Sequence, residues 1–180
     1  FVLDESGSIS YSDFQLETQG FMNALGSLPA DGRLEVSIVG FSDSSDVVAD
    51  KTLLTATGSN TLRNALDNNP KSDSGTNMSG AINTASSILS SSTAPSKIIC
   101  LATDGAPDSE SATMTAAANA KAAGITLAPI GIGLGSSGKN FLDSIASNPP
   151  IPNPTDFNEF GTVVRNVCVG IVQSAINLEL

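Results

Sequence analysis

The chain contains no histidine, and this absence removes several kinds of chemistry. Histidine is the general base of serine and cysteine hydrolases and the most common zinc ligand in proteins. Only two cysteines are present, Cys100 and Cys168, which are too few for a thiolate zinc site or a dense disulfide framework. Most conventional hydrolytic mechanisms are therefore excluded.

Positive charge is also scarce. Eight Lys and Arg residues stand against eighteen Asp and Glu residues, which gives a net charge of −10. Such a chain repels a phosphate backbone, so we expect no nucleic-acid partner. Charged residues make up only 14% of the sequence, and solubility rests on abundant Ser, Thr, Asn and Gly. This composition favours an extracellular or cell-surface setting.

Long hydrophobic runs are absent too. No apolar segment approaches the ~20 residues of a membrane span, so we expect no direct membrane insertion. A length of 180 residues with 40% apolar content predicts a single domain over residues 1–180. The sequence opens on the apolar run at residues 1–3, which is typical of the end of a strand. We therefore expect one domain of a longer chain, with neighbouring domains.

Short β-branched runs alternate with longer amphipathic stretches, which predicts an α/β fold with helices on both faces of a sheet. The second and third predicted strands are joined by a short polar turn, which indicates an antiparallel pair at one edge of a mainly parallel sheet. The strand at 97–102 is continuously apolar and is expected at the sheet centre. The predicted strands are 1–3, 34–41, 47–54, 97–102 and 125–132, and the predicted helices are 10–25, 61–66, 78–89, 112–123, 139–146 and 160–175.

Three polar clusters follow predicted strands or precede a predicted helix, where ligands bind in open α/β sheets. Directly after the first strand, Asp4, Ser6 and Ser8 alternate, so their side chains can project to one side of an extended segment. Thr76 lies in the loop before the helix at 78–89, and Asp104 ends the central apolar strand. Five oxygen donors without nitrogen or sulfur suit a hard divalent cation, Mg²⁺, Mn²⁺ or Ca²⁺, and not zinc.

These five residues, in this order, resemble the metal-ion-dependent adhesion site of von Willebrand factor type A domains. The resemblance covers essentially the whole chain and implies a doubly wound, six-stranded sheet with one antiparallel edge strand. It implies that Ser6, Ser8 and Thr76 bind the cation directly, and that Asp4 and Asp104 bind it directly or through water. The family's usual work is adhesion, in which an acidic group of a protein or glycan partner completes the coordination of the metal. The function expected is therefore a binding module and not an enzyme.

The same residues are also compatible with a purely structural role. Ser6 and Ser8 can cap the first helix, Thr76 can cap another, and Asp104 can start a turn. The joint occurrence of all five at strand ends argues against capping. Within the same family, an intracellular adaptor of an ATP-driven complex is the alternative function. Five other acidic residues are expected to be solvated turn or cap residues: Glu5, Asp43, Asp46, Asp73 and Asp108. A position at the rim of the site is the alternative for Asp43 or Asp73.

Two enzyme-like patterns compete with the metal site. Residues 133–140 match the Gly-x-x-x-x-Gly-Lys pattern of a phosphate-binding loop, but Asn140 stands where a metal-binding hydroxyl is needed. Nucleotide binding is therefore the less favoured alternative. An apolar strand followed by Asp4 also resembles haloacid-dehalogenase-type phosphatases. Ser6 stands where those enzymes carry an acidic proton donor, and a hydroxyl cannot act as that acid near neutral pH.

The two cysteines are expected to be buried, Cys100 in a strand and Cys168 on the apolar face of the last helix. Whether they form a disulfide is left open by the sequence. The last helix carries a wide apolar face over 160–175, which is typical of static core. In some members of the family a helix at this place slides when ligand binds, and a disulfide would prevent that movement.

Overall fold

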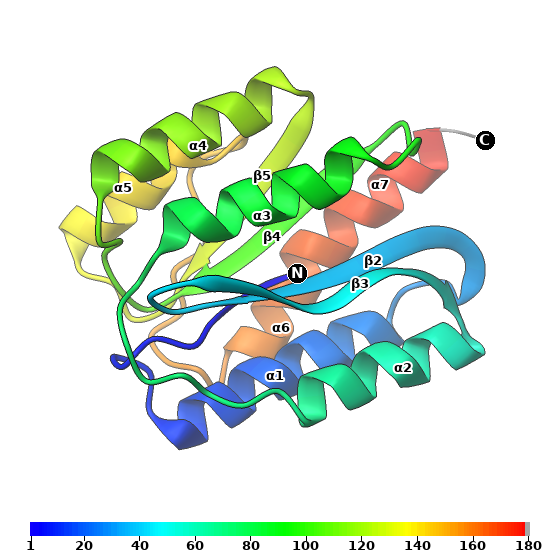
Figure 1. Ribbon diagram of the computed structural model, residues 1–180, viewed down its shortest axis with the longest axis horizontal. Helices are drawn as coiled ribbons and strands as arrows, with labels where there is room; N and C mark the ends of the chain where they lie inside the picture. Colours follow the sequence, from blue (N-terminus) through cyan, green and yellow to red (C-terminus); the bar gives the residue numbers. More distant parts are fainter. Residues whose placement is uncertain (179–180) are drawn as a thin grey trace.

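The computed structural model describes residues 1–178 and contains one mixed sheet with the strand order β3-β2-β1-β4-β5 (Figure 1). The β2–β3 pair is antiparallel and all other pairs are parallel, which confirms the predicted α/β class and the antiparallel edge. The central strand is β1, and the strand predicted at the centre, β4, lies beside it. The strands are β1 (Val2–Asp4), β2 (Asp31–Phe41), β3 (Ser45–Thr55), β4 (Lys97–Thr103) and β5 (Ile125–Gly131).

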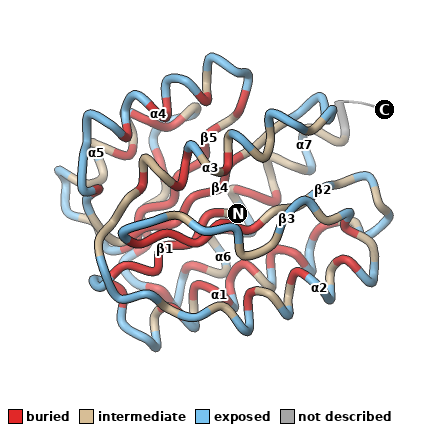
Figure 2. Tube along the Cα trace, in the orientation of Figure 1, coloured by how far each residue is buried: buried red, intermediate tan, exposed pale blue. Residues whose placement is uncertain are grey.

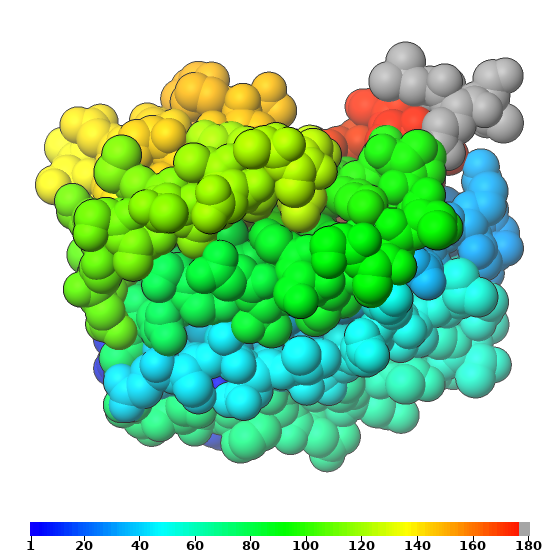
Figure 3. Space-filling view, turned by 45° about the horizontal axis from the view of Figure 1, so that its top comes forward, coloured from blue at the N-terminus to red at the C-terminus, as the bar shows by residue number. Residues whose placement is uncertain are grey.

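Helices cover both faces of the sheet (Figure 1). One face packs against α1 (Tyr11–Gly26), α2 (Ala56–Asp67) and the C-terminal helix, and the other against α3 (Met78–Ser90), α4 (Glu110–Ala122) and α5 (Ser136–Ile145). Each face carries its own buried apolar cluster, so β1 and most of β4 and β5 are buried, whereas the edge strand β3 is largely exposed or half-buried (Figure 2). From outside, α3 lies between α4 and the β2–β3 hairpin and forms one continuous surface with them (Figure 3).

The sheet has five strands in the described part of the chain, and the expectation of six was wrong. The segment beyond α5 runs beside the free edge of β5, where Pro152 and Pro154 accept hydrogen bonds from Gly131 N–H (3.2 Å) and Gly133 N–H (2.7 Å). A proline has no N–H to donate in return, so the segment accepts bonds from the edge without becoming a strand. The sheet therefore ends at β5, beside this proline-rich segment.

The predicted last helix is present but is not uniform. It consists of α6 (Phe160–Val164), a π-helical turn over Arg165–Val169 and α7 (Gly170–Leu178). Cys168 lies in the π-helical turn and forms a disulfide with Cys100 of β4. Both residues are buried, so the bond ties the helix to the sheet from inside. No helix among residues 1–178 is both long and apolar enough to cross a membrane.

Candidate metal centre

The candidate site lies where β1 and β4 end side by side. Asp4 is the last residue of β1, and Thr103 is the last residue of the neighbouring β4, with Asp104 next. Because parallel neighbours end at the same edge of a sheet, the two carboxylates are brought to one place. The Thr103 hydroxyl donates to Asp4 Oδ2 at 2.6 Å, which fastens the two strand ends together.

The two serines join this carboxylate pair. Ser6 N–H donates to Asp4 Oδ1 at 2.9 Å, which turns the chain after β1. The Ser6 and Ser8 hydroxyl oxygens lie 3.0 Å apart, and the Ser8 hydroxyl donates to Asp104 Oδ1 at 2.6 Å. Asp4, Ser6, Ser8 and Asp104 thus form one connected group, although 96 residues separate Ser8 from Asp104.

Thr76 reaches the same edge on a separate loop. Gly7 N–H donates to the Ser74 carbonyl at 2.8 Å, so this loop lies against the Ser6–Ser8 turn. Thr76 N–H donates to Asp108 Oδ1 at 2.9 Å. Across residues 1–178, no hydrogen bond joins the Thr76 side chain directly to the other four predicted ligands. The structure therefore connects four of the five predicted residues directly and places the fifth on a loop beside them.

Helix capping does not account for these residues. The N-cap of α1 is Ser10, whose hydroxyl oxygen accepts from Asp13 N–H. The N-cap of α3 is Asn77, and the N-cap of α4 is Ser109. Since the caps belong to other residues, the capping alternative for Ser6, Ser8 and Thr76 is wrong.

The spacing of the oxygens fits a small divalent cation. An octahedral Mg²⁺ ion with oxygens at about 2.1 Å places adjacent ligand oxygens about 3.0 Å apart. The Ser6–Ser8 separation of 3.0 Å matches this value, and the Ser8 hydroxyl, which donates to Asp104 Oδ1 at 2.6 Å, can bind a cation through its oxygen and still keep that bond. No cluster of three or more His, Cys, Asp or Glu side chains suited to a metal occurs in the part of the chain described. The candidate donors are hydroxyls with two carboxylates, which suits a hard cation.

Burial makes it unfavourable to ionise the carboxylates at this edge of the sheet. It raises the pKa of Asp4 from 3.8 to about 6, and it also raises the pKa of Asp104 above its ordinary value. Beneath them, the fully buried Glu17 of α1 accepts from Asp4 N–H at 3.1 Å, while its Oε2 has no hydrogen-bond partner. Burial and, next, the nearby Asp4 hold the pKa of Glu17 well above its usual range. A dication placed here would offset this crowding of negative charge.

Further polar residues contact the predicted ligands through bonds that the sequence does not announce. Glu5 was expected to be solvated, but it is buried and accepts from the Asn69 amide at 2.8 Å and from the Ser72 hydroxyl. The ammonium of Lys71 donates to the Ser6 carbonyl at 2.9 Å and pairs with Asp73. Glu5 and Asn69, like Ser6 and Lys71, lie more than sixty positions apart, so no local pattern announces these contacts.

Two further acidic residues hold the Thr76 loop. Asp43 is exposed and accepts from Gly75 N–H at 2.9 Å and from the Ser74 hydroxyl, so it lies against the loop that carries Thr76. Asp108, expected to be a solvated cap residue, is exposed, but its Oδ1 accepts from the backbone of the predicted ligand Thr76. A negative charge within a few residues of each polar cluster was the only sequence signal for these roles.

The Asp108→Ala variant should bind a divalent cation roughly tenfold or more weakly than the unmodified chain, because Thr76 N–H loses its bond to the Asp108 carboxylate and only the bond from Asp108 N–H to the Thr76 carbonyl remains. Titration calorimetry with Mg²⁺ measures the change. Asp50→Ala removes an equal charge from an exposed position in the middle of β3 and should leave the affinity unchanged. Equal affinities in the two variants would contradict the positioning role of Asp108.

Cation binding should also depend on pH. In the metal-free chain the pKa of Asp4 is about 6, against 3.8 when the group is exposed, so ionisation of Asp4 lowers stability as the pH rises through this range. A cation must displace the proton to bind this group. Saturating Mg²⁺ should therefore raise the melting temperature more at about pH 7.5 than at about pH 5. An equal rise at both values would contradict this expectation.

The phosphate-loop pattern falls between β5 and α5. The helix begins after Gly135 without a side-chain cap, and Lys139 forms an ion pair of 2.7 Å with Asp143, one turn further along α5. Asp143 also accepts from Ile151 N–H at 2.7 Å. The lysine of this pattern is thus held by a carboxylate that anchors the proline-rich segment.

Solved structures from several organisms share this fold. Proximal thread matrix protein 1 from the mussel byssus aligns with a TM-score of 0.79 and 22% identity over 91% of this chain and 44% of that one. The pilus adhesin SpaC from Lactobacillus rhamnosus GG aligns with a TM-score of 0.84 and 18% identity over 96% and 30%. The von Willebrand domain of a type V pilus tip protein from Porphyromonas gingivalis gives 0.79 and 14% over 97% and 94%.

The chain spans less than half the length of the mussel protein and of SpaC. A further structure of the mussel protein has a zinc-occupied metal-ion-dependent adhesion site motif. A search of curated proteins found no significant match. The family model for the von Willebrand factor type A domain matches residues 1–166, nearly the whole sequence. This chain therefore belongs to the von Willebrand factor type A domain family.

Proposed function

We propose that this domain is a cation-dependent adhesion module that works outside the cell. One divalent cation, preferably Mg²⁺, with Mn²⁺ or Ca²⁺ as substitutes, is held by Ser6, Ser8 and Thr76, with Asp4 and Asp104 bound directly or through water. An acidic group of a protein or glycan partner completes its coordination. The domain is not an enzyme in this proposal.

The observation that carries the proposal is the connected group of Asp4, Ser6, Ser8 and Asp104, whose hydrogen-bonded atoms lie 2.6–3.0 Å apart. Helix capping explains none of the three hydroxyl residues, because the N-caps lie elsewhere. The two carboxylates carry as much charge as a dication, but both also accept hydrogen bonds from the protein, which weakens their hold on the cation. The cation can therefore still attract an external carboxylate.

Net charge makes the cation essential to this function. A chain of charge −10 repels an acidic partner unless a cation stands between them. Mussel byssus matrix and pilus adhesion are the settings of the related structures, which supports adhesion and an extracellular location.

A glycan and peptide array tests the proposal. The domain with Mg²⁺ should retain acidic glycans or peptides, EDTA should abolish the signal, and fresh Mg²⁺ should restore it. Ser8→Ala should lose the signal, whereas Ser12→Ala, an exposed serine on α1, should keep it. Binding that survives EDTA would contradict the proposal.

Saturable ATP binding is not expected, because Lys139 is already paired with Asp143 and the chain is acidic. Equilibrium dialysis with ATP and Mg²⁺ measures this. ATP retention that disappears in the Lys139→Ala variant would favour the nucleotide-binding alternative instead.

A further inference from the structure

The segment at residues 69–74, between α2 and α3, lies along the turn that follows β1. Both oxygens of the Glu5 carboxylate accept from side chains of this segment, and the Glu5 carbonyl accepts from one of its backbone N–H groups at 3.0 Å. Gly7 N–H donates to the Ser74 carbonyl at 2.8 Å. The segment is therefore fixed to the turn on both sides of the predicted ligand Ser6.

Lys71 places a positive charge inside this contact. Its side chain is only 3% exposed, and its ammonium donates to the Ser6 carbonyl at 2.9 Å and pairs with Asp73. The Asp73 side chain is 74% exposed, so water weakens its attraction for the ammonium. Lysine is rarely buried unless its charge is paired, and here one carboxylate at the surface compensates that charge only in part. The remaining positive charge acts on the acidic edge beside it.

The ammonium affects carboxylates on both sides of the turn. Burial raises the pKa of Asp104 and of Glu5 above their ordinary values, and the charge of Lys71 opposes both shifts. A positive charge in this position reduces the repulsion among carboxylates that share a small volume. By the same Coulomb interaction, it repels a divalent cation bound by those carboxylates.

We propose that Lys71 is a built-in counter-ion of the candidate metal centre. Its ammonium stabilises this edge of the sheet when no divalent cation is bound, and it lowers the affinity of the site for such a cation. The second effect rests on the proposed function, whereas the first does not. Lys71 thus keeps the turn in place without a cation and makes a bound cation easier to release.

The Lys71→Met variant removes the charge and keeps a side chain of similar length. It should bind Mg²⁺ about tenfold more tightly than the unmodified chain in titration calorimetry, because the repulsion is gone. Without a divalent cation it should melt roughly 5 °C lower. Loss of the bond to the Ser6 carbonyl by itself would loosen the turn and weaken Mg²⁺ binding. The direction of the change in affinity therefore separates a role of the charge from a purely structural role.

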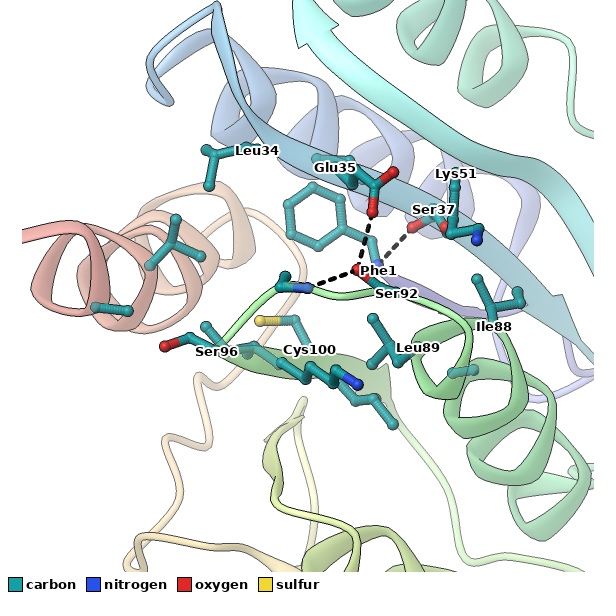
Figure 4. Close-up of a pocket in the computed structure, with 18 of the residues that line it drawn as sticks. Phe1, Leu34, Glu35, Ser37, Lys51, Ile88, Leu89, Ser92, Ser96 and Cys100 are labelled. Atoms are coloured by element: carbon teal, nitrogen blue, oxygen red, sulfur yellow. Dashed lines mark hydrogen bonds between the residues drawn. The ribbon is translucent and has the colours of Figure 1, made fainter. Parts of the chain in front are cut away.

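The Asp73→Asn variant changes the same balance in the opposite direction. Asp73 has a φ of 58°, which asparagine and aspartate adopt more readily than most other residues, so the substitution should leave the backbone unchanged. Without the Asp73 charge, the Lys71 ammonium is uncompensated, and Mg²⁺ should bind several-fold more weakly. Lys51→Met is the matched control. Lys51 is exposed and lies beside a cavity at the amino end of β4 (Figure 4), so its loss should change neither affinity nor melting temperature.

Equal or weaker Mg²⁺ binding by Lys71→Met, with binding intact in the unmodified chain, would overturn the counter-ion role and leave the adhesion proposal standing. If none of the chains bound Mg²⁺, the adhesion proposal and the effect of Lys71 on affinity would both be wrong. The melting temperatures without a cation still decide the stabilising effect in that case. A Lys71→Met chain as stable as the Lys51→Met chain would overturn it.

Discussion

Replacing Asp104 by alanine is expected to abolish cation binding, a loss of about 100-fold or more in affinity, while the domain stays folded. Asp104 follows β4 in a turn and is only partly buried, and its side-chain oxygen accepts from the Ser8 hydroxyl. The carboxylate therefore contributes to the site and little to either apolar core. Removing one of two charged donors leaves the cation with mainly neutral ligands in partly buried surroundings.

Titration calorimetry with Mg²⁺ and Mn²⁺ measures the loss, and circular dichroism checks the fold. The Asp50→Ala variant removes the same charge from an exposed position in β3 and should bind as the unmodified chain does. A folded Asp104→Ala variant with undiminished affinity would show that the cation binds elsewhere.

Removal of the Cys100–Cys168 disulfide is expected to produce the largest loss of stability. The bond closes a loop across 68 positions of sequence, which corresponds to about 4 kcal/mol of chain entropy removed from the unfolded state. For a domain of this size, that loss corresponds to a drop of roughly 10 °C in melting temperature. Both cysteines are buried, so the variant that replaces both by alanine also loses packing.

Thermal unfolding with and without a reductant separates these two effects. The reductant should lower the melting temperature of the unmodified chain and leave that of the Cys100→Ala/Cys168→Ala variant unchanged. An unmodified chain that melts at the same temperature under both conditions would show that the disulfide does not constrain the unfolded state.

The same bond bears on whether the C-terminal helix moves. It joins the π-helical turn at Arg165–Val169 to β4, so a one-turn slide of α6 and α7 along the sheet would have to break it. In addition, the Phe160 ring lies against Gly20 of α1, where a Cβ atom would come within 2.5 Å of it. These contacts agree with a static apolar face and leave little room for a second register.

Local signals predicted much of this structure. The helix predicted at 10–25 is α1, which Ser10 caps, and the polar turn before Ser45 produces the predicted antiparallel pair. The alternation of Asp4, Ser6 and Ser8 was sufficient to place these three side chains together, because strand and turn geometry are set by adjacent residues. The place of Asp104 at this edge was predicted because it directly follows an apolar strand.

The features that the sequence did not predict depend on distant partners. Glu17 is buried because α1 packs under β1, and its contact with Asp4 has no periodic pattern of its own. Predicting the pairing of Cys100 with Cys168 requires knowing which side of the last helix Cys168 lies on, and the π-helical turn changes that side. The sixth strand was expected from the family resemblance alone, and Pro152 and Pro154, which lack the N–H that a ladder needs, rule it out beside β5.

Anomalous diffraction from crystals grown with Mn²⁺ tests the central claim most directly. The proposal predicts one strong peak at the carboxyl ends of β1 and β4, within about 2.2 Å of the Ser6 and Ser8 hydroxyl oxygens. Thr76 and the carboxylates of Asp4 and Asp104 should surround the same peak, directly or through one water. A fully occupied Mn²⁺ ion elsewhere, with Asp4, Ser6, Ser8 and Asp104 still hydrogen-bonded to one another, would contradict the proposed site.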